Sequence, residues 1–281
     1  MSDEPVIYIV ATPIGNIDDI TLRAIKVLKN SDLIAAEDTR KTGILLSELG
    51  IKSKMTAFHD HNENEKSNYL IDQAIQGKKI AIVSDAGTPL VSDPGFRLVE
   101  KASNQGVRLI PVPGASALTA LVSVSGLPTD RFAFFGFLPS KESSRNKILK
   151  DLENSDYPIM FYESPKRIIK TLDEIVLKTG DRDAVLGREL TKIHEEIIRG
   201  KLSEIKRILL SKNSVKGEIA IFIQGGINKS MKEIDLCKIV KSELEKSKLK
   251  PKLVAEKIAL EYNLKKNDIY KVILELKEQN N

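Results

Sequence analysis

The residues best suited to chemistry occur in short polar stretches that each follow an apolar run of strand length. The richest, residues 84–95 (SDAGTPLVSDPG), combines carboxylates, small residues and two turn-forming prolines. In an open α/β sheet, ligands bind beyond the carboxyl ends of the strands. Free backbone N–H groups beside a carboxylate suit a ligand that carries both an ammonium and a carboxylate group. The stretch therefore predicts a ligand-binding loop, with a tightly capped structural loop as the alternative.

Two other turns have the same position relative to a strand-like run. Residues 11–16 (ATPIGN) contain Gly15, which permits close backbone approach or a positive φ. Gly114 and the small residues after it open an apolar helix, and small side chains would let a ligand lie against the backbone. A structural turn and a buried domain junction are the alternatives for these segments. Neither G-x-G-x-x-G nor a Walker A loop occurs, so we expect neither of those sites.

Acidic and basic residues cluster after three further strand-like runs. The clusters are residues 37–40 (EDTR), 161–167 (FYESPKR) and 187–192 (GRELTK). Any one of them could be a helix start: Ser164 as N-cap and Pro165 at the first helical position would explain the second. Three clusters at the carboxyl ends of strands would form one rim, which favours a functional site.

The histidines and the cysteine give little support to a metal site. His59 and His61 would share a face if they lay on a strand, but a zinc site needs a third ligand and no nearby residue is an obvious one. A polar loop near the substrate is the favoured interpretation. The single cysteine, Cys237, excludes an internal disulfide and a cysteine-rich zinc site.

Strand-like runs alternate with amphipathic helical patterns through the first 225 residues. Strands are expected at Val6–Ala11, Leu33–Ala36, Lys54–Phe58, Ile80–Ser84 and Val107–Val112, and helices at Leu22–Lys29, Thr42–Leu49, Glu65–Gln76 and Pro94–Asn104. A second series has strands near Arg131–Phe137, Pro158–Tyr162, Ala184–Arg188 and Glu218–Ile223, and helices near Glu142–Leu152, Lys166–Val176 and Leu202–Leu210. This alternation predicts an α/β fold with a largely parallel sheet covered on both faces.

The segment Pro111–Ala115 lies between the two series and predicts two consecutive α/β domains, residues 1–114 and 115–228. The pattern then changes to helices alone. The first carries an apolar stripe of Met231, Ile234, Cys237, Val240 and Leu244, the second opens at Pro251, and Asn267 or Asp268 caps the third. Residues 229–281 are therefore expected to form a small all-helical domain of helix-turn-helix type. Contact with nucleic acid, internal packing and dimerisation are its possible roles.

Charge is concentrated at the end of the chain. From residue 229 onward there are 13 Lys, no Arg and 9 acidic residues, a net charge of +4, against 31 basic and 30 acidic residues in the first 228. A basic tail suits a polyanionic partner, although a lysine-rich solvated surface would have the same composition. No apolar run approaches the ~18 residues of a membrane span, and the first residues lack the basic region of a signal peptide. We therefore expect a cytoplasmic protein that is not bound to a membrane.

Ten motifs in this order and spacing resemble one family: TPIGN, EDTR, FHDHNE, SDAGTPLVSDPG, PVPGASA, SGLP, FGFLP, FYESPKR, GRELTK and GEIAIFI. The chain is similar to the 16S ribosomal RNA (cytidine-2′-O)-methyltransferases of the RsmI type, within the tetrapyrrole-methylase superfamily. The resemblance covers nearly the whole chain. It implies two α/β domains with S-adenosylmethionine between them, a homodimer, no metal, and methylation of a cytidine ribose in the decoding region of the small ribosomal subunit. Corrin and porphyrin members have a GPGD-like first turn, and TPIGN in its place argues against a tetrapyrrole substrate.

The resemblance also implies a cofactor site. The methionine end would be lined by Pro13, Asp85, Ala86, Gly87 and Thr88. The sulfonium and sugar would lie over Ala115, Ser116 and Ala117, and the adenosine would be held by Tyr162, Leu190, Thr191, Ile219 and Ala220.

The implied reaction is an in-line attack of a ribose 2′-oxygen on a sulfonium methyl group, in which alignment supplies most of the acceleration. A ribose hydroxyl is a poor acid, so a carboxylate or a lysine that accepts its proton would help. The candidates for catalysis are Glu37, Asp38, Glu163, Glu189 and Lys192; Arg40, Lys166 and Arg167, with Lys192, would bind flanking phosphates. Two alternatives are a same-fold methylase of a small molecule or a protein, and a non-catalytic RNA-binding or ribosome-assembly protein.

Overall fold

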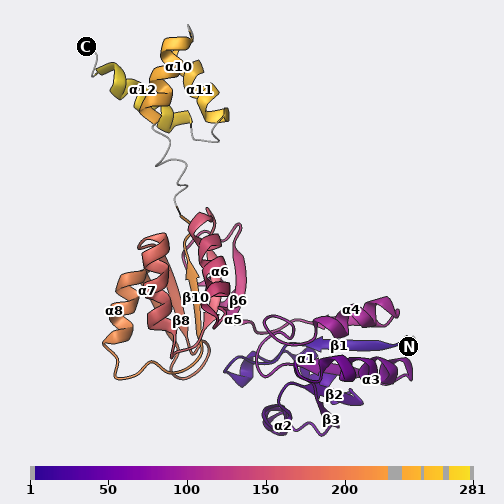
Figure 1. Cartoon of the computed structure of the whole chain (residues 1–281). Helices are drawn as coiled ribbons and strands as arrows, with labels where there is room; N and C mark the ends of the chain where they lie inside the picture. Colours follow the sequence, from indigo (N-terminus) through magenta and orange to yellow (C-terminus); the bar gives the residue numbers. More distant parts are fainter. Residues whose placement is uncertain (1–3, 227–235, 248–249, 262–265, 279–281) are drawn as a thin grey trace. The chain divides into compact units, whose positions relative to one another are not determined.

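The computed structural model describes residues 4–226, 236–247, 250–261 and 266–278. The chain forms two compact units: residues 1–153 with 157–225, here called unit 1, and residues 154–156 with 226–281, called unit 2 (Figure 1). The predicted boundary between residues 228 and 229 falls outside the described residues. The predicted division of unit 1 after residue 114 remains a prediction. In the described part of the chain, no helix is long and apolar enough to cross a membrane.

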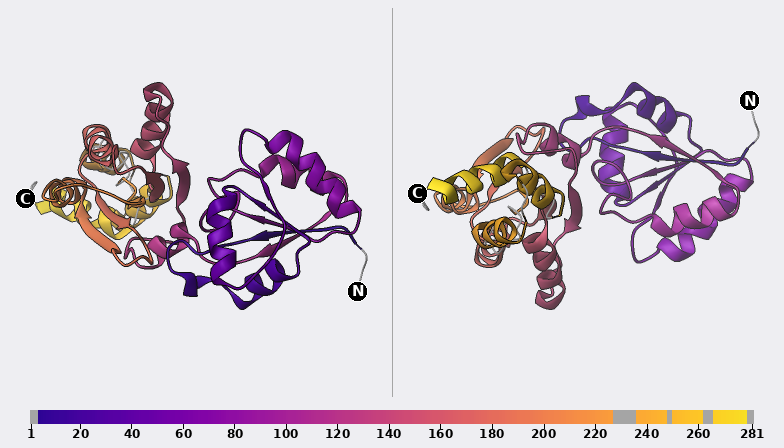
Figure 2. Two further views of the ribbon diagram at one scale, coloured as in Figure 1. Left: turned by 90° about the horizontal axis from the view of Figure 1, so that it is seen from below. Right: turned by 90° about the horizontal axis from the view of Figure 1, so that it is seen from above.

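The first half of unit 1 is a parallel sheet between two helical layers, as predicted (Figure 2). Its strands are β1 (Val6–Val10), β2 (Leu33–Ala36), β3 (Met55–Ala57), β4 (Ile80–Val83) and β5 (Arg108–Val112), in the order β3-β2-β4-β1-β5. A 3-10 turn (Ile17–Asp19) precedes α1 (Leu22–Lys29), and the other helices are α2 (Thr39–Glu48), α3 (Glu63–Ile75) and α4 (Phe96–Asn104). Apolar residues of α3 and α4 cover one face of the sheet, and those of α1 and α2 cover the other. All five strands therefore end at one rim.

The second half of unit 1 is a mixed sheet in the order β6-β7-β10-β8-β9. Its strands are β6 (Ala133–Phe137), β7 (Ile159–Glu163), β8 (Asp183–Arg188), β9 (Glu196–Lys201) and β10 (Ile219–Ile223). Three helices pack on one face, α6 (Glu142–Asn154), α7 (Ile168–Thr179) and α8 (Leu202–Leu210), and α5 (Ala117–Ser123) packs on the other. Strand β10 runs antiparallel to both of its neighbours, so β7 and β8 end at the edge of the sheet where β10 begins.

Two details of the second sheet differ from the prediction. Only β6 and β7 pair in parallel, and β9 was not expected at all. The residues of β9, EIIRGK, contain few apolar positions, because this strand lies at the edge of the sheet and pairs with one neighbour. An alternation of strands and helices does not by itself set strand direction. Strands β8 and β9 pair antiparallel because a short loop, and not a helix, connects them.

Two expected helix starts beside the sheet ends were wrong. Helix α2 begins at Thr39 instead of Thr42, with the Asp38 side chain accepting a hydrogen bond from the Arg40 N–H as its N-cap. Helix α7 begins at Ile168 instead of Lys166, and Ser164, the alternative N-cap, does not cap it. Both errors arose because polar turn residues compete with regular structure for backbone hydrogen bonds. His59 and His61 follow β3 in a loop, as in the favoured interpretation, with their rings edge to face at 5.9 Å between centroids.

Unit 2 contains helices α10 (Leu236–Lys246), α11 (Pro251–Glu261) and α12 (Lys266–Glu278). They share a core of apolar side chains that includes Val240, Val254 and Ile273. Pro251 opens its helix as predicted, but α12 already includes Asn267 and Asp268, so neither residue caps it. Met231, Ile234 and Tyr262 lie outside the described residues, and the side chain of Cys237 is likewise not described.

Candidate active site

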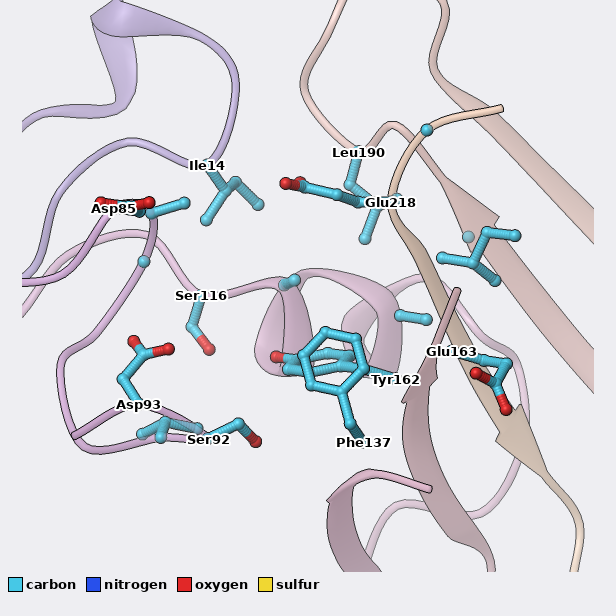
Figure 3. Close-up of a pocket in the computed structure, with 18 of the residues that line it drawn as sticks. Ile14, Asp85, Ser92, Asp93, Ser116, Phe137, Tyr162, Glu163, Leu190 and Glu218 are labelled. Atoms are coloured by element: carbon cyan, nitrogen blue, oxygen red, sulfur yellow. The ribbon is translucent and has the colours of Figure 1, made fainter. Parts of the chain in front are cut away.

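A cavity of about 380 Å³ opens within unit 1 where the rims of the two sheets meet (Figure 3). One side, here called the charged wall, comes from the loops after β2 and β4 and the start of α2, and consists of Glu37, Lys41, Asp85, Ser92 and Asp93. The opposite side, the apolar wall, comes from β6, β7, β10 and the loop after β8, and consists of Phe137, Tyr162, Leu190, Ile219 and Ala220. Ile14, Ser116 and Ala117 also line the cavity.

Hydrogen bonds join the three loops that the sequence singled out. Thr12 and Gly87 exchange two backbone hydrogen bonds, of 2.8 and 3.0 Å, as an isolated antiparallel bridge. The Thr88 hydroxyl donates to the Ala115 carbonyl at 3.3 Å, and the Thr12 hydroxyl donates to the Ser84 carbonyl at 3.2 Å. The turns after β1, β4 and β5 thus form one connected floor, which confirms the predicted convergence of these segments on one rim.

The backbone is strained in two of the loops that line the cavity. Among the described residues other than glycine, positive φ angles occur at Leu90 and Ser92 in the loop after β4, and at Glu189 and Thr191 in the loop after β8. A side chain in this region costs about 1–3 kcal/mol and persists only where the surrounding structure enforces it. Strain confined to two loops of one cavity indicates a function there.

Asp85 connects the loop after β4 to the loop after β2. Its carboxylate accepts hydrogen bonds from Lys41 Nζ at 2.6 Å and from the Asp38 N–H at 3.0 Å. The Asp85 N–H in turn donates to a Glu37 carboxylate oxygen at 3.3 Å. The hydrogen bond to Asp85 raises the pKa of Lys41. An ammonium group of a ligand can bind Asp85 only by sharing its oxygens with Lys41 or by displacing that side chain.

Glu163 lines the cavity but is fully engaged by its own domain. Its side chain is completely buried and accepts hydrogen bonds from Arg167 Nε at 2.7 Å, the Thr171 hydroxyl at 2.8 Å and the Ser164 N–H at 2.7 Å. Arg167 also donates to the Leu138 carbonyl and to the Ser140 hydroxyl. This pair holds β7 against α7, and Figure 3 shows the Glu163 carboxylate directed away from the cavity centre.

The third charged cluster lies at the border of the cavity. Lys192 donates to Glu189 at 3.0 Å and to the cavity-lining Glu218 at 3.1 Å. The hydrogen bond from the Glu218 N–H, and to a smaller extent the one from Lys192, lowers the pKa of Glu189. Burial lowers the pKa of Lys192, but its two carboxylate partners outweigh that effect and raise it. Neither Glu189 nor Lys192 is among the residues that line the cavity.

The same loop touches the turn after β1. The Thr191 hydroxyl accepts a hydrogen bond from the Asn16 N–H at 3.1 Å, and Gly15 has no room for a side chain because Thr191 and Lys192 lie against it. This contact is the physical reason for a glycine in ATPIGN. Thr191 and Pro13 do not line the cavity, whereas Ile14 does.

Arg40 and Lys166 extend outside the cavity. The Arg40 side chain is 88% exposed and forms a two-pronged contact with Asp38, with N···O distances of 3.0 and 2.7 Å. Hydrogen bonds from Arg40 hold the pKa of Asp38 below its ordinary range. Lys166 is exposed in the turn before α7. Both cations are accessible to a large anionic partner.

The apolar wall has an aromatic centre. The Tyr162 ring packs edge to face on Phe134 and Phe137, with centroid distances of 5.0 and 5.5 Å. Burial raises the pKa of Tyr162 to about 12, so the phenol stays neutral at physiological pH. Phe137 itself is more than half exposed. An aromatic surface of this kind binds a flat heterocycle or a cation over its face.

Many of the predicted residues meet at this cavity. Those that line it are Glu37, Asp85, Ala86, Gly87, Thr88, Ser116, Ala117, Tyr162, Glu163, Leu190, Ile219 and Ala220. Those that do not line it are Pro13, Asp38, Arg40, Ala115, Lys166, Arg167, Glu189, Thr191 and Lys192. The lining residues that were not predicted are Ile14, Lys41, Val91, Ser92, Asp93, Phe137, Ser164, Pro165, Gly187, Gly217 and Glu218. Asp93 lies within the SDAGTPLVSDPG stretch. It was not predicted as a site residue because the Asp-Pro-Gly turn was interpreted as the start of a helix.

Asp93 has no cationic partner in the described part of the chain and has a raised pKa. Burial raises its pKa to about 6 against the effect of a hydrogen bond from Ser84, and nearby Glu37, Asp85 and Asp60 act in the same direction as burial. Among the described residues, Glu163, Asp85 and Glu218 each have a cationic partner, whereas Glu37 and Asp93 have none. The cavity therefore has an excess of negative charge, which favours a cationic ligand over a phosphate.

Among the described residues, no group of three or more His, Cys, Asp and Glu side chains is arranged to hold a metal ion. The His59 Nδ1 atom is buried without a hydrogen-bond partner. The neighbouring Asn62 amide nitrogen lies 3.4 Å from the other ring nitrogen of His59.

Comparison with known proteins gives consistent relationships. Residues 6–206 match the family described as tetrapyrrole (corrin/porphyrin) methylases. Ribosomal RNA small subunit methyltransferase I of Pasteurella multocida is 43% identical over 272 residues, which cover 96% of this chain and 97% of that protein. The protein of the same name from Thermotoga maritima is 45% identical over 219 residues, which cover 78% of this chain but 98% of the relative.

Solved structures share the fold at lower identity. Diphthine synthase is similar with a TM-score of 0.61 at 17% identity, over 78% of this chain and 90% of that one. Cobalt precorrin-4 methyltransferase is similar with a TM-score of 0.59 at 19% identity, over 78% of this chain and 94% of that one. Proteins of different names thus share this architecture, so the fold alone does not select a substrate.

Proposed function

The chain belongs to the tetrapyrrole (corrin/porphyrin) methylases, and from this premise we propose that it transfers a methyl group from S-adenosylmethionine to the RNA of the small ribosomal subunit. It is a methyltransferase with relatives named for small-subunit ribosomal RNA at over 40% identity along nearly their whole length. The more specific proposal is that the acceptor is the ribose 2′-hydroxyl of a cytidine in the decoding region of 16S ribosomal RNA.

One observation carries the cofactor assignment: the cavity combines a wall with excess negative charge and an aromatic, apolar wall. S-adenosylmethionine has the same division, because its sulfonium and ammonium groups are cationic and its adenine is a flat heterocycle. When bound, it supplies a methyl group activated by the sulfonium. The fit supports Asp85, Ala86, Gly87 and Thr88 as contacts of the methionine end.

The remaining contacts follow from the same orientation. Ser116 and Ala117 would lie under the sulfonium and sugar, with Tyr162, Leu190, Ile219 and Ala220 around the adenosine. Pro13, Ala115 and Thr191 would not contact the cofactor directly. They would support the floor of the cavity, because the turn after β1 and the start of α5 form hydrogen bonds beneath it.

The charged residues divide into two proposed roles. The exposed Arg40 and Lys166 can bind phosphates beside the target nucleotide. Arg167 is largely used by Glu163, and Lys192 by Glu189 and Glu218, so their contribution to RNA binding would be smaller. For the proton of the ribose hydroxyl, the internal partners of Asp38, Glu163 and Glu189 make them weak bases.

Unit 1 is proposed to hold all of the chemistry. The Thermotoga maritima relative is matched over 98% of its length by 219 residues of this chain. Unit 1 has about the same length. Unit 2, with its lysine-rich composition, would then add affinity for the ribosomal subunit. A homodimer, a cytoplasmic location and chemistry without a metal belong to the same proposal.

The test is a transfer assay with tritiated S-adenosylmethionine and small subunits that lack the modification. We expect label in one nucleotide of the small-subunit RNA, as a 2′-O-methylcytidine after digestion. Label on a base or on a ribosomal protein would contradict the proposed acceptor. Cofactor binding by calorimetry without transfer to any RNA would instead support a non-catalytic assembly role.

A further inference from the structure

We propose that Asp93 is the group that accepts the proton of the substrate hydroxyl during methyl transfer. This inference rests on the proposed function, since it names the base for that reaction. The hydroxyl O–H bond breaks and its proton passes to an Asp93 oxygen, the hydroxyl oxygen bonds to the methyl carbon, and the carbon–sulfur bond breaks with its electron pair on sulfur. Asp93 later returns the proton to water.

Asp93 lies at the cavity, on the side of the charged wall. It lies in the loop after β4, on the same side as Asp85 and Ser116 and opposite Phe137, Tyr162 and Leu190 (Figure 3). A methyl acceptor must enter between the two walls, because the transferred group lies between the methionine end and the adenosine of its donor. Asp93 faces that space from the charged wall.

Three of the other acidic side chains of the cavity are paired with cations. Asp85 is bonded to Lys41, Glu163 to Arg167, and Glu218 to Lys192. A carboxylate in an ion pair is a weaker base, since its cation stabilises the charged form. Glu37 accepts a hydrogen bond from the backbone N–H of Asp85, whereas Asp93 accepts one from the hydroxyl of Ser84.

The electrostatic surroundings of Asp93 also suit a general base. A general base works best when its pKa lies near the pH of the reaction. The groups that face Asp93 are Asp60 after β3, Glu37 after β2, Asp85 after β4 and the neutral Tyr162 on β7, with Lys41 held by Asp85. Together with burial, the three carboxylates raise the pKa of Asp93 to about 6. It is therefore charged at neutral pH and still more basic than an ordinary aspartate.

The loop that carries Asp93 is held in one conformation. Leu90 and Ser92 have positive φ angles, and Gly95, just after Asp93, donates its N–H to the buried Glu63 at 3.0 Å. Glu63 also accepts the Arg97 N–H at 3.0 Å, which fixes the start of α4. A base must be positioned to within a fraction of an ångström, and this loop is supported from both ends.

The test compares D93N with D60N on unmodified small subunits at saturating cofactor. Asp60 is the matched control because it is exposed, is close enough to affect Asp93, and does not line the cavity. We expect D93N to lower kcat by about 10²- to 10⁴-fold, the usual contribution of a general base. D60N should keep the plateau rate of the wild type, and D93E should recover part of the loss.

The pH profile gives a second readout. Wild-type kcat/KM for the cofactor, which reports the free protein, should fall below pH about 6 with unit slope and be flat above it, because the protonated carboxyl cannot accept a proton. The small residual rate of D93N should show no such limb. In D60N the limb should move to lower pH, because removing a neighbouring carboxylate lowers the pKa of Asp93.

A third readout does not depend on turnover. In the ligand-free protein, infrared titration should show a carboxylic acid band that disappears with a midpoint near pH 6 in the wild type and is missing in D93N. A native pKa above the unfolded value makes this group favour folding at low pH and lose that contribution as pH rises through 6. D93N should therefore melt no lower than the wild type at pH 8.

The outcomes separate the two levels of the proposal. If the wild type labels no RNA, the proposed function fails. If the wild type is active and D93N matches it, or if E37Q alone removes the rate, the base is not Asp93. A D93N protein that binds cofactor far more weakly but reaches the wild-type kcat at saturation would make Asp93 a cofactor ligand, and would also overturn the inference.

Discussion

The charged wall and the apolar wall of the cavity are built in different ways. The charged wall consists of loops after parallel strands, and its side chains are held by hydrogen bonds between segments far apart in the sequence, such as Lys41 with Asp85. The apolar wall consists largely of strand residues, such as Tyr162 and Ala220, that face one another across paired strands. The positions of side chains in the apolar wall therefore depend on the pairing of strands in the sheet, whereas those in the charged wall depend on a few polar contacts. Substitutions in the two walls should therefore have different effects.

The largest expected effect tests the border of the apolar wall. Glu163→Ala should lower the free energy of unfolding by about 3–5 kcal/mol, because it leaves the charge of Arg167 without a counterion and the Thr171 hydroxyl without its acceptor next to a buried core. The measurement is urea denaturation followed by circular dichroism. Lys170→Ala, at an exposed position on α7, is the control and should change the free energy of unfolding by less than about 0.5 kcal/mol. A stable Glu163→Ala protein with reduced kcat would instead revive Glu163 as a catalytic residue.

The second prediction concerns the charged wall. Asp85→Ala should weaken S-adenosylmethionine binding by about 100-fold or more while the protein stays folded, because a charge-assisted hydrogen bond is lost and Lys41 is left facing a cationic ligand. Isothermal titration calorimetry measures the affinity, and thermal melting checks the fold. Asp72→Ala, which removes an exposed carboxylate on α3, is the control. Unchanged affinity would count against the loop after β4 as the methionine site.

A smaller effect is expected at the centre of the apolar wall. Tyr162→Ala should weaken cofactor binding by about 10-fold, because an aromatic contact is worth roughly 0.5–1.5 kcal/mol beyond the apolar area that it buries. Tyr162→Phe should bind nearly as well as the wild type, since the ring and not the phenol makes the contact. If the two variants lost affinity equally, the hydroxyl would be the important group and the wall would be less apolar in function than its composition indicates.

The smallest expected effect lies outside both walls. Arg40→Glu should weaken binding to the small subunit by a few-fold and reduce the slope of log affinity against log salt by about one, as for the loss of one phosphate contact. Cofactor binding should survive, because Arg40 does not line the cavity. Filter binding at several salt concentrations and calorimetry supply the two numbers. Equal loss of both affinities would mean that the Arg40–Asp38 pair supports the cavity instead of RNA.

Reversing the charge of Lys192 is a less clean version of the same experiment. Lys192 is paired with Glu189 and Glu218, so a glutamate at this position would also disturb the loop after β8. Comparing it with Arg40→Glu would show how far the polar contacts of that loop support the apolar wall.

The parallel sheet and the region of the site could be predicted because they depend on local patterns. Fully apolar strands such as Ile80–Val83 are typical of a parallel sheet buried on both faces, and polar turn residues after them mark a binding rim. The antiparallel pairing of β10 with β7 and β8 could not be predicted, because strand direction depends on which strands become neighbours. Edge strand β9 was missed for a similar reason, since it has little apolar surface of its own.

The sequence by itself determined the family, the two-part α/β plan of unit 1 and the loops that meet at the cavity. Only the tertiary structure decided which charged groups remain available there. Glu163 and Asp93 are both acids beside a strand or loop end, yet one is neutralised by Arg167 from the following turn, and the other is half-buried with no cation near it among the residues that the structure describes. The physical reason is that the basicity of a carboxylate depends on desolvation and on neighbouring charges, and both are set by residues that are distant in the sequence.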